Sequence, residues 1–192
     1  MIKRFCLFLE LLAIAAPLAC AQTANWMPDK AHSEVDFSIL HLGLANVRGR
    51  FGNVEGVVVF DQSDITKSSV NLTIDVTTVD TGVGARDADL KSAHFFNVAR
   101  YPNATFVSTS VKKEGSDLIV TGNLTLDAVT KPVVLRVQGP TGPVMGMDHK
   151  EHCGFSATAT IDRTAFGIGP GYPAAMIGDA VKLSIDLDLA KQ

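Results

Sequence analysis

Apolar and polar side chains alternate along short segments from about residue 32 almost to the C-terminus. In residues 69–79, one face carries four apolar side chains and the other carries polar ones; the apolar residues are Val70, Leu72, Ile74 and Val76. Because successive side chains of a β-strand point to opposite faces, this pattern predicts a strand with one buried face. Similar patterns predict strands at 32–43, 47–51, 52–61, 105–112, 118–126, 133–138, 153–162 and 181–189.

These segments amount to about eight strands, the number at which a β-barrel can hold either side chains or one small ligand. The predicted fold class is therefore all-β, an eight-stranded barrel. Residues 82–97 interrupt the strand rhythm with alanines, Leu90 and charged residues that favour a short helix. Phe95 and Phe96 follow it, so this segment is predicted to cap one end of the barrel.

Two further segments are irregular. Residues 139–152 contain glycines and prolines that predict a long hairpin loop without regular pairing. Residues 166–178 are apolar for a surface loop and are expected to fold over an opening of the barrel.

The N-terminus has the pattern of a secretory signal peptide. A short basic start is followed by an apolar run and by small residues that predict cleavage after Ala21. Residues 22–192 are then a single exported domain, and no other stretch has the roughly twenty apolar residues of a spanning helix. Acylation of Cys20 is the alternative, although Pro17 stands where a lipoprotein site usually has leucine.

Charge and cysteine content narrow the function classes. The formal net charge of the chain is −3 and no basic stripe is present, so nucleic acid is excluded as an expected partner. Outside the predicted signal peptide Cys153 is the single cysteine, and no intramolecular disulfide is expected. By parity with Phe155, Cys153 points inward as an unreactive core thiol.

The alternation also indicates what the barrel encloses. A barrel that spans an outer membrane turns apolar side chains outward and carries aromatic girdles, which this chain lacks. With the polar face in water the interior is apolar, and strands of nine to twelve residues give a tube roughly 30–40 Å long before tilt. An apolar guest is therefore expected.

The ordered motifs of the chain resemble those of the YceI-like family, exported lipocalin-like barrels known as polyisoprenoid-binding proteins. The similarity covers nearly all of residues 26–167; it includes Trp26, His32-Ser33, His41-Leu-Gly43, Val47-Arg-Gly-Arg-Phe51, Phe60-Asp61, Arg86-Asp87, Phe95-Phe96, Tyr101-Pro102, Gly122-Asn-Leu-Thr125, Gly154-Phe155 and Ile161-Asp-Arg163. The resemblance implies a periplasmic, eight-stranded antiparallel barrel of the lipocalin or streptavidin type, with a short helical cap. It also implies a cavity that takes a long isoprenoid tail, such as that of a quinone or a polyprenol precursor, and no other cofactor.

The expected ligand-binding residues are inward-facing positions of the predicted strands, cap and last loop. Small members such as Ala157 leave room that bulky ones would fill, although the same residues could instead pack a dry core. The set is Phe37, Ile39, Val58, Phe60, Leu72, Ile74, Val76, Phe95, Phe96, Phe106, Leu124, Leu135, Phe155, Ala157, Phe166, Leu183 and Ile185.

Other functions stay open as alternatives. The cluster Asp148–Cys153 concentrates five potential zinc or copper ligands, but on an extended chain His149 and His152 point to opposite faces. No catalytic residue is predicted, because no nucleophile elbow is present and Asp162-Arg163 is interpreted as a capping or rim ion pair. A barrel without a ligand, in a stress-related structural role, and a homodimer are the remaining alternatives.

Overall fold

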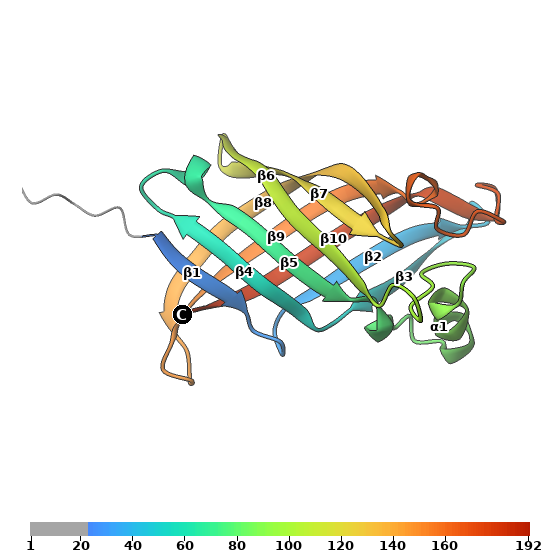
Figure 1. Cartoon of the computed structure of the whole chain (residues 1–192), viewed down its shortest axis with the longest axis horizontal. Coiled ribbons are helices and arrows are strands. Elements are labelled where there is room, and N and C mark those ends of the chain that lie inside the picture. The colour runs from blue at the N-terminus through green and yellow to red at the C-terminus, as the bar shows by residue number, and fades with distance from the viewer. Residues whose placement is uncertain (1–22) are drawn as a thin grey trace, which may run out of the picture.

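The computed structural model describes residues 23–192 and shows a β-barrel built almost entirely from antiparallel strands (Figure 1). The predicted signal peptide and Cys20 lie outside the described residues. The strands are β1 (Thr23–Pro28), β2 (Glu34–His41), β3 (Ala45–Phe51), β4 (Val54–Asp61), β5 (Ser69–Asp75), β6 (Asn103–Glu114), β7 (Asp117–Leu126), β8 (Val129–Met145), β9 (Glu151–Asp162) and β10 (Ile177–Lys191).

These ten strands occupy eight positions around the barrel wall, as the alternation predicts, and we call each position a stave. β1 and β2 both pair with β10, at its C-terminal and N-terminal parts, and so act as one interrupted stave. β3 pairs with β2, and β4 pairs with β1 and β5, so β3 and β4 form a second interrupted stave. Each remaining strand pairs with its sequence neighbour, and the β1–β10 and β2–β10 pairings close the barrel.

Local hydrogen bonds explain where the staves are interrupted. Between β1 and β2 the Asp29 carboxylate accepts from the backbone N–H groups of Ala31 and His32, which turns the chain.

β5 ends earlier than predicted because Asp75 accepts from the backbone N–H of Thr77 and starts a 3₁₀ turn, Val76–Thr78. Val76 therefore reaches the interior from a turn and not from a strand.

The prediction of a long loop at 139–152 is wrong. β8 continues to Met145 and pairs with β9 through Thr141, Val144 and Met145. The pairing shifts register on both sides of Thr141, so the glycines and prolines there act as bulges. A short turn then joins β8 to β9.

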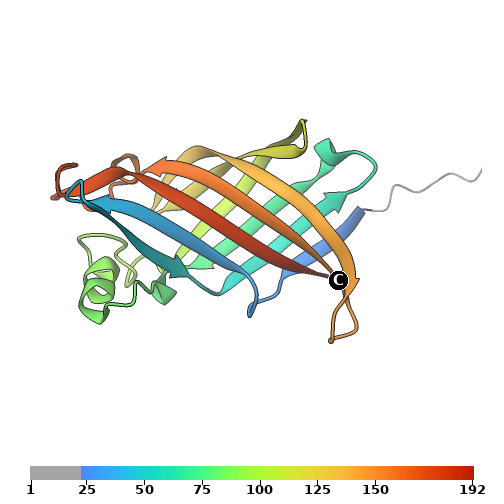
Figure 2. The ribbon, with the colours of Figure 1, turned by 180° about the vertical axis from the view of Figure 1, so that it is seen from behind.

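The predicted cap is present as α1 (Gly84–Lys91) and the turn that follows it. It lies at one end of the barrel, here called the cap end (Figure 1). The β2–β3 turn and the segment before β10 meet at this same end, seen at the left of Figure 2, where the Leu42 N–H donates to the Met176 carbonyl over 2.9 Å. Residues 23–192 include no helix with the length and apolar content needed to cross a bilayer.

The interpretation of Arg163 as a rim residue is wrong. Its side chain is 3% exposed, and its guanidinium donates to the segment between β9 and β10 and to the start of β10. The acceptors are the carbonyls of Ile168, Gly169, Tyr172, Ile177 and Gly178 and the carboxylate of Asp179, over 2.7–3.1 Å. Sequence parity could not show this, because three of the acceptors belong to the irregular segment before β10 and the other three to the first residues of β10.

Candidate functional site

The barrel interior is hollow. Two cavities lie inside it, of about 590 Å³ at the cap end and about 130 Å³ further in. We call them the cap chamber and the inner chamber. Both are lined mainly by apolar side chains, and Ser68 is the single polar residue lining the inner chamber.

The two chambers share four side chains from four different strands, which form a waist between them: Val35 of β2, Ile74 of β5, Leu124 of β7 and Leu183 of β10. All four are only partly buried although they face the interior. In a close-packed core such side chains would be fully enclosed by neighbours. Their residual exposure therefore comes from the hollow, and a slender guest could pass between the chambers.

Two phenylalanine–glycine pairs help to keep the interior open. A methyl group added at Gly49 would lie 2.4 Å from the ring of Phe37, and one at Gly122 would lie 2.4 Å from the ring of Phe106. Each ring therefore lies against a bare stretch of the neighbouring strand, β3 or β7, and does not fill the centre. Any larger residue at these glycines would push the rings into the chambers.

The structure brings all but one of the seventeen predicted ligand-binding residues to the chamber walls. The cap chamber is lined by Phe37, Ile39, Val76, Phe95 and Phe96, the waist includes Ile74, Leu124 and Leu183, and the inner chamber is lined by Val58, Phe60, Leu72, Phe106, Leu135, Phe155, Ala157 and Ile185. Phe166 is the exception. It is 2% exposed in a 3₁₀ turn and packs into the apolar cluster around Phe95, lining neither chamber.

Sequence reasoning missed lining residues for two reasons. A bulge at Ser108–Ser110 of β6 reverses the parity, so Val111 faces inward together with Phe106. Tyr172 belongs to the irregular segment before β10, which carries no periodicity, and Ile177 begins β10 just ahead of a register shift. Others, such as Leu187, continue the alternation of Leu183 and Ile185 and could have been found from parity.

The cap chamber also has polar side chains at its wall: His41, Arg86, Asp89 and Arg163. Arg86 is held by Thr81, with Nε donating to Thr81 Oγ1 over 2.7 Å and Nη2 to the Thr81 carbonyl over 2.9 Å. Asp89 lies 3.4 Å from Nδ1 of His94. This end of the cavity can therefore hydrogen-bond a polar group with several side chains, whereas among the described residues the inner chamber offers only the Ser68 hydroxyl.

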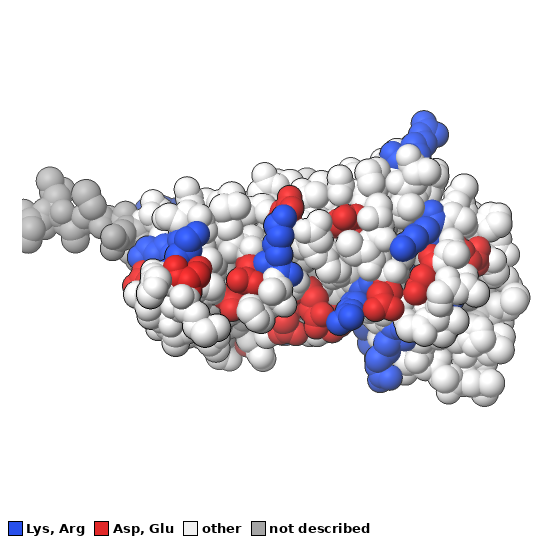
Figure 3. Space-filling view, turned by 90° about the horizontal axis from the view of Figure 1, so that it is seen from below, with Lys and Arg blue, Asp and Glu red and all other residues white. Residues whose placement is uncertain are grey.

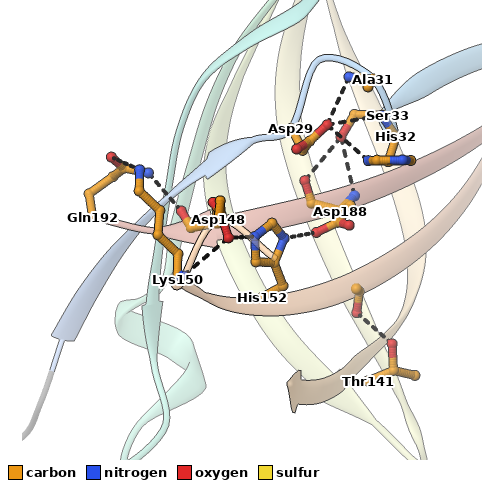
Figure 4. A network of polar contacts seen from close by, with 12 residues as sticks. Asp29, Ala31, His32, Ser33, Thr141, Asp148, Lys150, His152, Asp188 and Gln192 are labelled. Carbon is orange, nitrogen blue, oxygen red and sulfur yellow. Dashed lines mark hydrogen bonds and ion pairs between the residues drawn. The ribbon is translucent and has the colours of Figure 1, made fainter. Parts of the chain in front are cut away.

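A polar network lies on the outer wall at the opposite end (Figure 4). His152 of β9 stands between two carboxylates, with Nδ1 2.6 Å from Asp188 and Nε2 3.1 Å from Asp148. Ser33 bonds to the backbone of Asp188, so it does not join His32 and Asp29 in a catalytic arrangement. The network fastens the β8–β9 turn and the β1–β2 turn to β10.

A match to a known family model shows which protein family the chain belongs to. The model of the YceI-like domain matches residues 26–189. The chain belongs to the YceI-like family. Protein YceI of Escherichia coli is 44% identical over 138 residues, 71% of this chain and 72% of that protein. A UPF0312 protein of Pectobacterium atrosepticum is 39% identical over 172 residues, 88% of each chain.

Solved structures show the same YceI-like barrel. BcnA of Burkholderia cenocepacia has a TM-score of 0.75 at 25% identity, covering 84% of this chain and 98% of that one. The YceI protein of Campylobacter jejuni has a TM-score of 0.71 at 29% identity, covering 80% and 90%. A polyisoprenoid binding domain from Saccharophagus degradans matches at 0.63 and 18% identity, covering 89% and 100%, and supports the fold alone.

The cluster Asp148–Cys153 does not converge in this YceI-like barrel. His152 faces outward to Asp148 and Asp188, whereas Cys153 faces inward and packs with Trp26 and Leu189. Among residues 23–192, no group of three or more His, Cys, Asp or Glu side chains is arranged to hold a metal ion. The metal alternative therefore finds no support in the geometry of the cluster.

The His152 contacts predict a pH-dependent stability. Hydrogen bonding to Asp188, aided by Asp148, raises the pKa of His152 above its ordinary 6.5. The stabilisation is therefore complete below about pH 6.5 and is lost as pH rises through the folded-state pKa. We expect the free energy of unfolding, measured in urea from pH 5.5 to 9, to fall with pH in the YceI-like chain and to fall less in His152→Gln.

Asp148 determines how the same contacts lose their contribution to stability at acid pH. The backbone N–H of Lys150 and the His152 ring lower the pKa of Asp148 from 3.8, so its contribution is lost as pH falls through that lower value. The control is His32→Gln, because exposed His32 contacts Asp29 and no second carboxylate. If His32→Gln flattened the profile and His152→Gln did not, the assignment to His152 would be wrong.

Cys153 is predicted to be unreactive in the native YceI-like barrel. Burial raises the pKa of the Cys153 thiol to about 11, with a smaller contribution from Asp188. Since the thiolate is the reactive form, a maleimide at pH 7.5 should label Cys153 of residues 22–192, which contain no other cysteine, within minutes in urea and leave it unlabelled in the native state. Equal labelling rates in the two states would contradict this placement.

Proposed function

We propose that this chain is an exported, non-enzymatic carrier that encloses a long apolar isoprenoid of the polyprenol or isoprenoid-quinone type. The observation that carries the proposal is the hollow itself. Two apolar chambers follow one another along the barrel and meet at a waist of four side chains. A long, thin hydrocarbon matches that shape better than a compact ligand does.

The chemistry of the walls agrees with an amphiphilic guest. The cap chamber, at about 590 Å³, lies within the range of small-molecule sites. Burial of the tail stabilises the complex by about 25 cal/mol per Å² of apolar surface removed from water. His41, Arg86 and Asp89 at the cap end offer hydrogen bonds to a head group, which places the tail inward and the head at the opening.

The barrel also occurs in a protein named for such a ligand. The Saccharophagus degradans domain, which shares the fold at 18% identity, is named for polyisoprenoid binding. The basic and apolar N-terminal sequence supports export to the periplasm. We assign no catalytic role, because Arg86 is held by Thr81, Asp89 lies beside His94, and among the described residues the cap chamber is lined by no serine, threonine or cysteine.

The test is native mass spectrometry of the chain purified from its own host, followed by solvent extraction and identification of the bound lipid. We expect one molecule of an isoprenoid-tailed lipid per barrel. A protein that is free of lipid, and that also fails to take up a long-chain isoprenoid quinone from detergent micelles, would overturn the proposal. A bound fatty acid or a compact aromatic would restrict it to apolar binding of another class.

A further inference from the structure

Two uncharged segments meet at the tip of the cap end. Residues 39–47 and 164–178 contain no Asp, Glu, Lys or Arg. They lie side by side, since the Leu42 N–H donates to the Met176 carbonyl. Three side chains there project into solvent and form what we call the apolar rim: Leu42, 49% exposed, Leu44, 84% exposed, and Met176, 46% exposed. In Figure 3 the outermost part of this end is white, whereas acidic and basic side chains follow the barrel wall.

The backbone at Leu42 shows that this apolar residue is costly to the fold. β2 and β3 are joined by three residues, Leu42, Gly43 and Leu44. The two central positions of the turn have positive φ, 54° at Leu42 and 69° at Gly43, and the Leu44 N–H donates to the His41 carbonyl over 3.0 Å. Turns of this kind favour Asn, Asp or Gly at the first position, because other residues are strained there. An exposed leucine returns little packing, so a contact outside the chain gives a reason for its presence.

The apolar rim borders the opening of the cap chamber. His41 and Val47, which flank the turn, line that chamber, and so do Tyr172 and Ile177, which flank Met176. The rim side chains themselves line neither chamber. Leu42 and Leu44 stand on the β2–β3 turn and Met176 lies beside it in the segment before β10, so the three form a tip and not a groove that could hold a peptide.

We propose that the apolar rim inserts into the surface of a lipid bilayer and places the opening of the cap chamber against it. A lipid surface is the occupant that fits, because the tip is uncharged, protrudes and adjoins an apolar cavity. Shallow insertion of apolar side chains is how monotopic proteins hold a bilayer interface. The role in ligand exchange rests on the proposed function, whereas the docking itself does not require a ligand.

The test measures flotation of the purified protein with phosphatidylcholine vesicles. We expect the protein to float with the vesicles and Leu42→Asn combined with Leu44→Thr to weaken this partitioning about tenfold or more, since burial of one leucine changes an equilibrium by about that factor. Because Asn suits the turn better than Leu, the same variant should melt at an equal or higher temperature. Loss of binding without loss of stability separates docking from a structural role.

The matched control removes apolar side chains that are still more exposed, at the opposite end: Val144→Thr with Met147→Thr, which are 64% and 101% exposed in the native chain. This control should float like the native protein. Equal loss in both variants, or no flotation of the native chain, would overturn the proposal. A native dimer that the rim variant makes monomeric, with no flotation, would assign the rim to a second copy instead. Lipid content from native mass spectrometry tests the carrier function separately.

Discussion

Ile74→Arg is expected to lower the affinity for a long-chain isoprenoid quinone by about a hundredfold or more, because it places a charge beside the tail in an apolar passage. Ile74 lies at the waist and lines both chambers. A guest that extends through the barrel must pass it. The arginine can reach towards the cap chamber with its long stem, so the barrel can keep its fold while the passage is closed. The measurement is lipid retained per barrel after delipidation and reloading.

The control is the neighbouring substitution Thr73→Lys. Thr73 lies next to Ile74 on β5 and points to the outer face, so an added charge there meets water. It should leave retention unchanged. If Ile74→Arg proves unstable, Ala157→Phe gives a second route, because a ring there fills the inner chamber with apolar atoms. That variant should exclude long tails and still accept short ones, and equal retention by all three variants would place the ligand outside the barrel.

The staves could be predicted from the sequence because each strand has one face in water and one face inside the barrel. In β5, Leu72 and Ile74 face inward and Asn71 and Thr73 face outward, as parity requires. β1 was not predicted, because its pairing with both β4 and β10 depends on closure of the barrel. The extent of β8 was underestimated for a similar reason, since partners on β9 hold it across glycines and prolines.

The hollow could not be deduced in the same way. The alternation along a strand shows which side chains face inward, but it does not show whether these side chains fill the centre of the barrel. Phe37 and Phe106 are large enough to fill space, yet each lies over a glycine of a neighbouring strand. Phe166 is a large apolar residue like those that line the chambers, but it packs instead into the buried cluster with Phe95 and Ile168. Such outcomes depend on cross-strand neighbours that no local pattern records.

Arg163 illustrates the same limit and carries the largest expected effect on stability. Arg163→Met should lower the free energy of unfolding by about 3–5 kcal/mol, because removal of a buried guanidinium leaves its acceptors without donors. The orphaned groups include the carbonyls of Ile168, Tyr172 and Ile177, three residues that also line the cap chamber. Urea unfolding of both chains at pH 7 measures the difference.

The matched control is Arg136→Met on the outer wall. Arg136 pairs with Asp117 and Glu114, but half of its side chain is exposed, so its loss should cost about 1 kcal/mol or less. Asp179→Asn should also have a small effect, because the carboxylate is partly exposed and the five carbonyls still hold the guanidinium. Equal, small losses in all three variants would contradict the role given to Arg163. Since the segment that it anchors forms part of the chamber wall, Arg163→Met should also release bound lipid faster than either control.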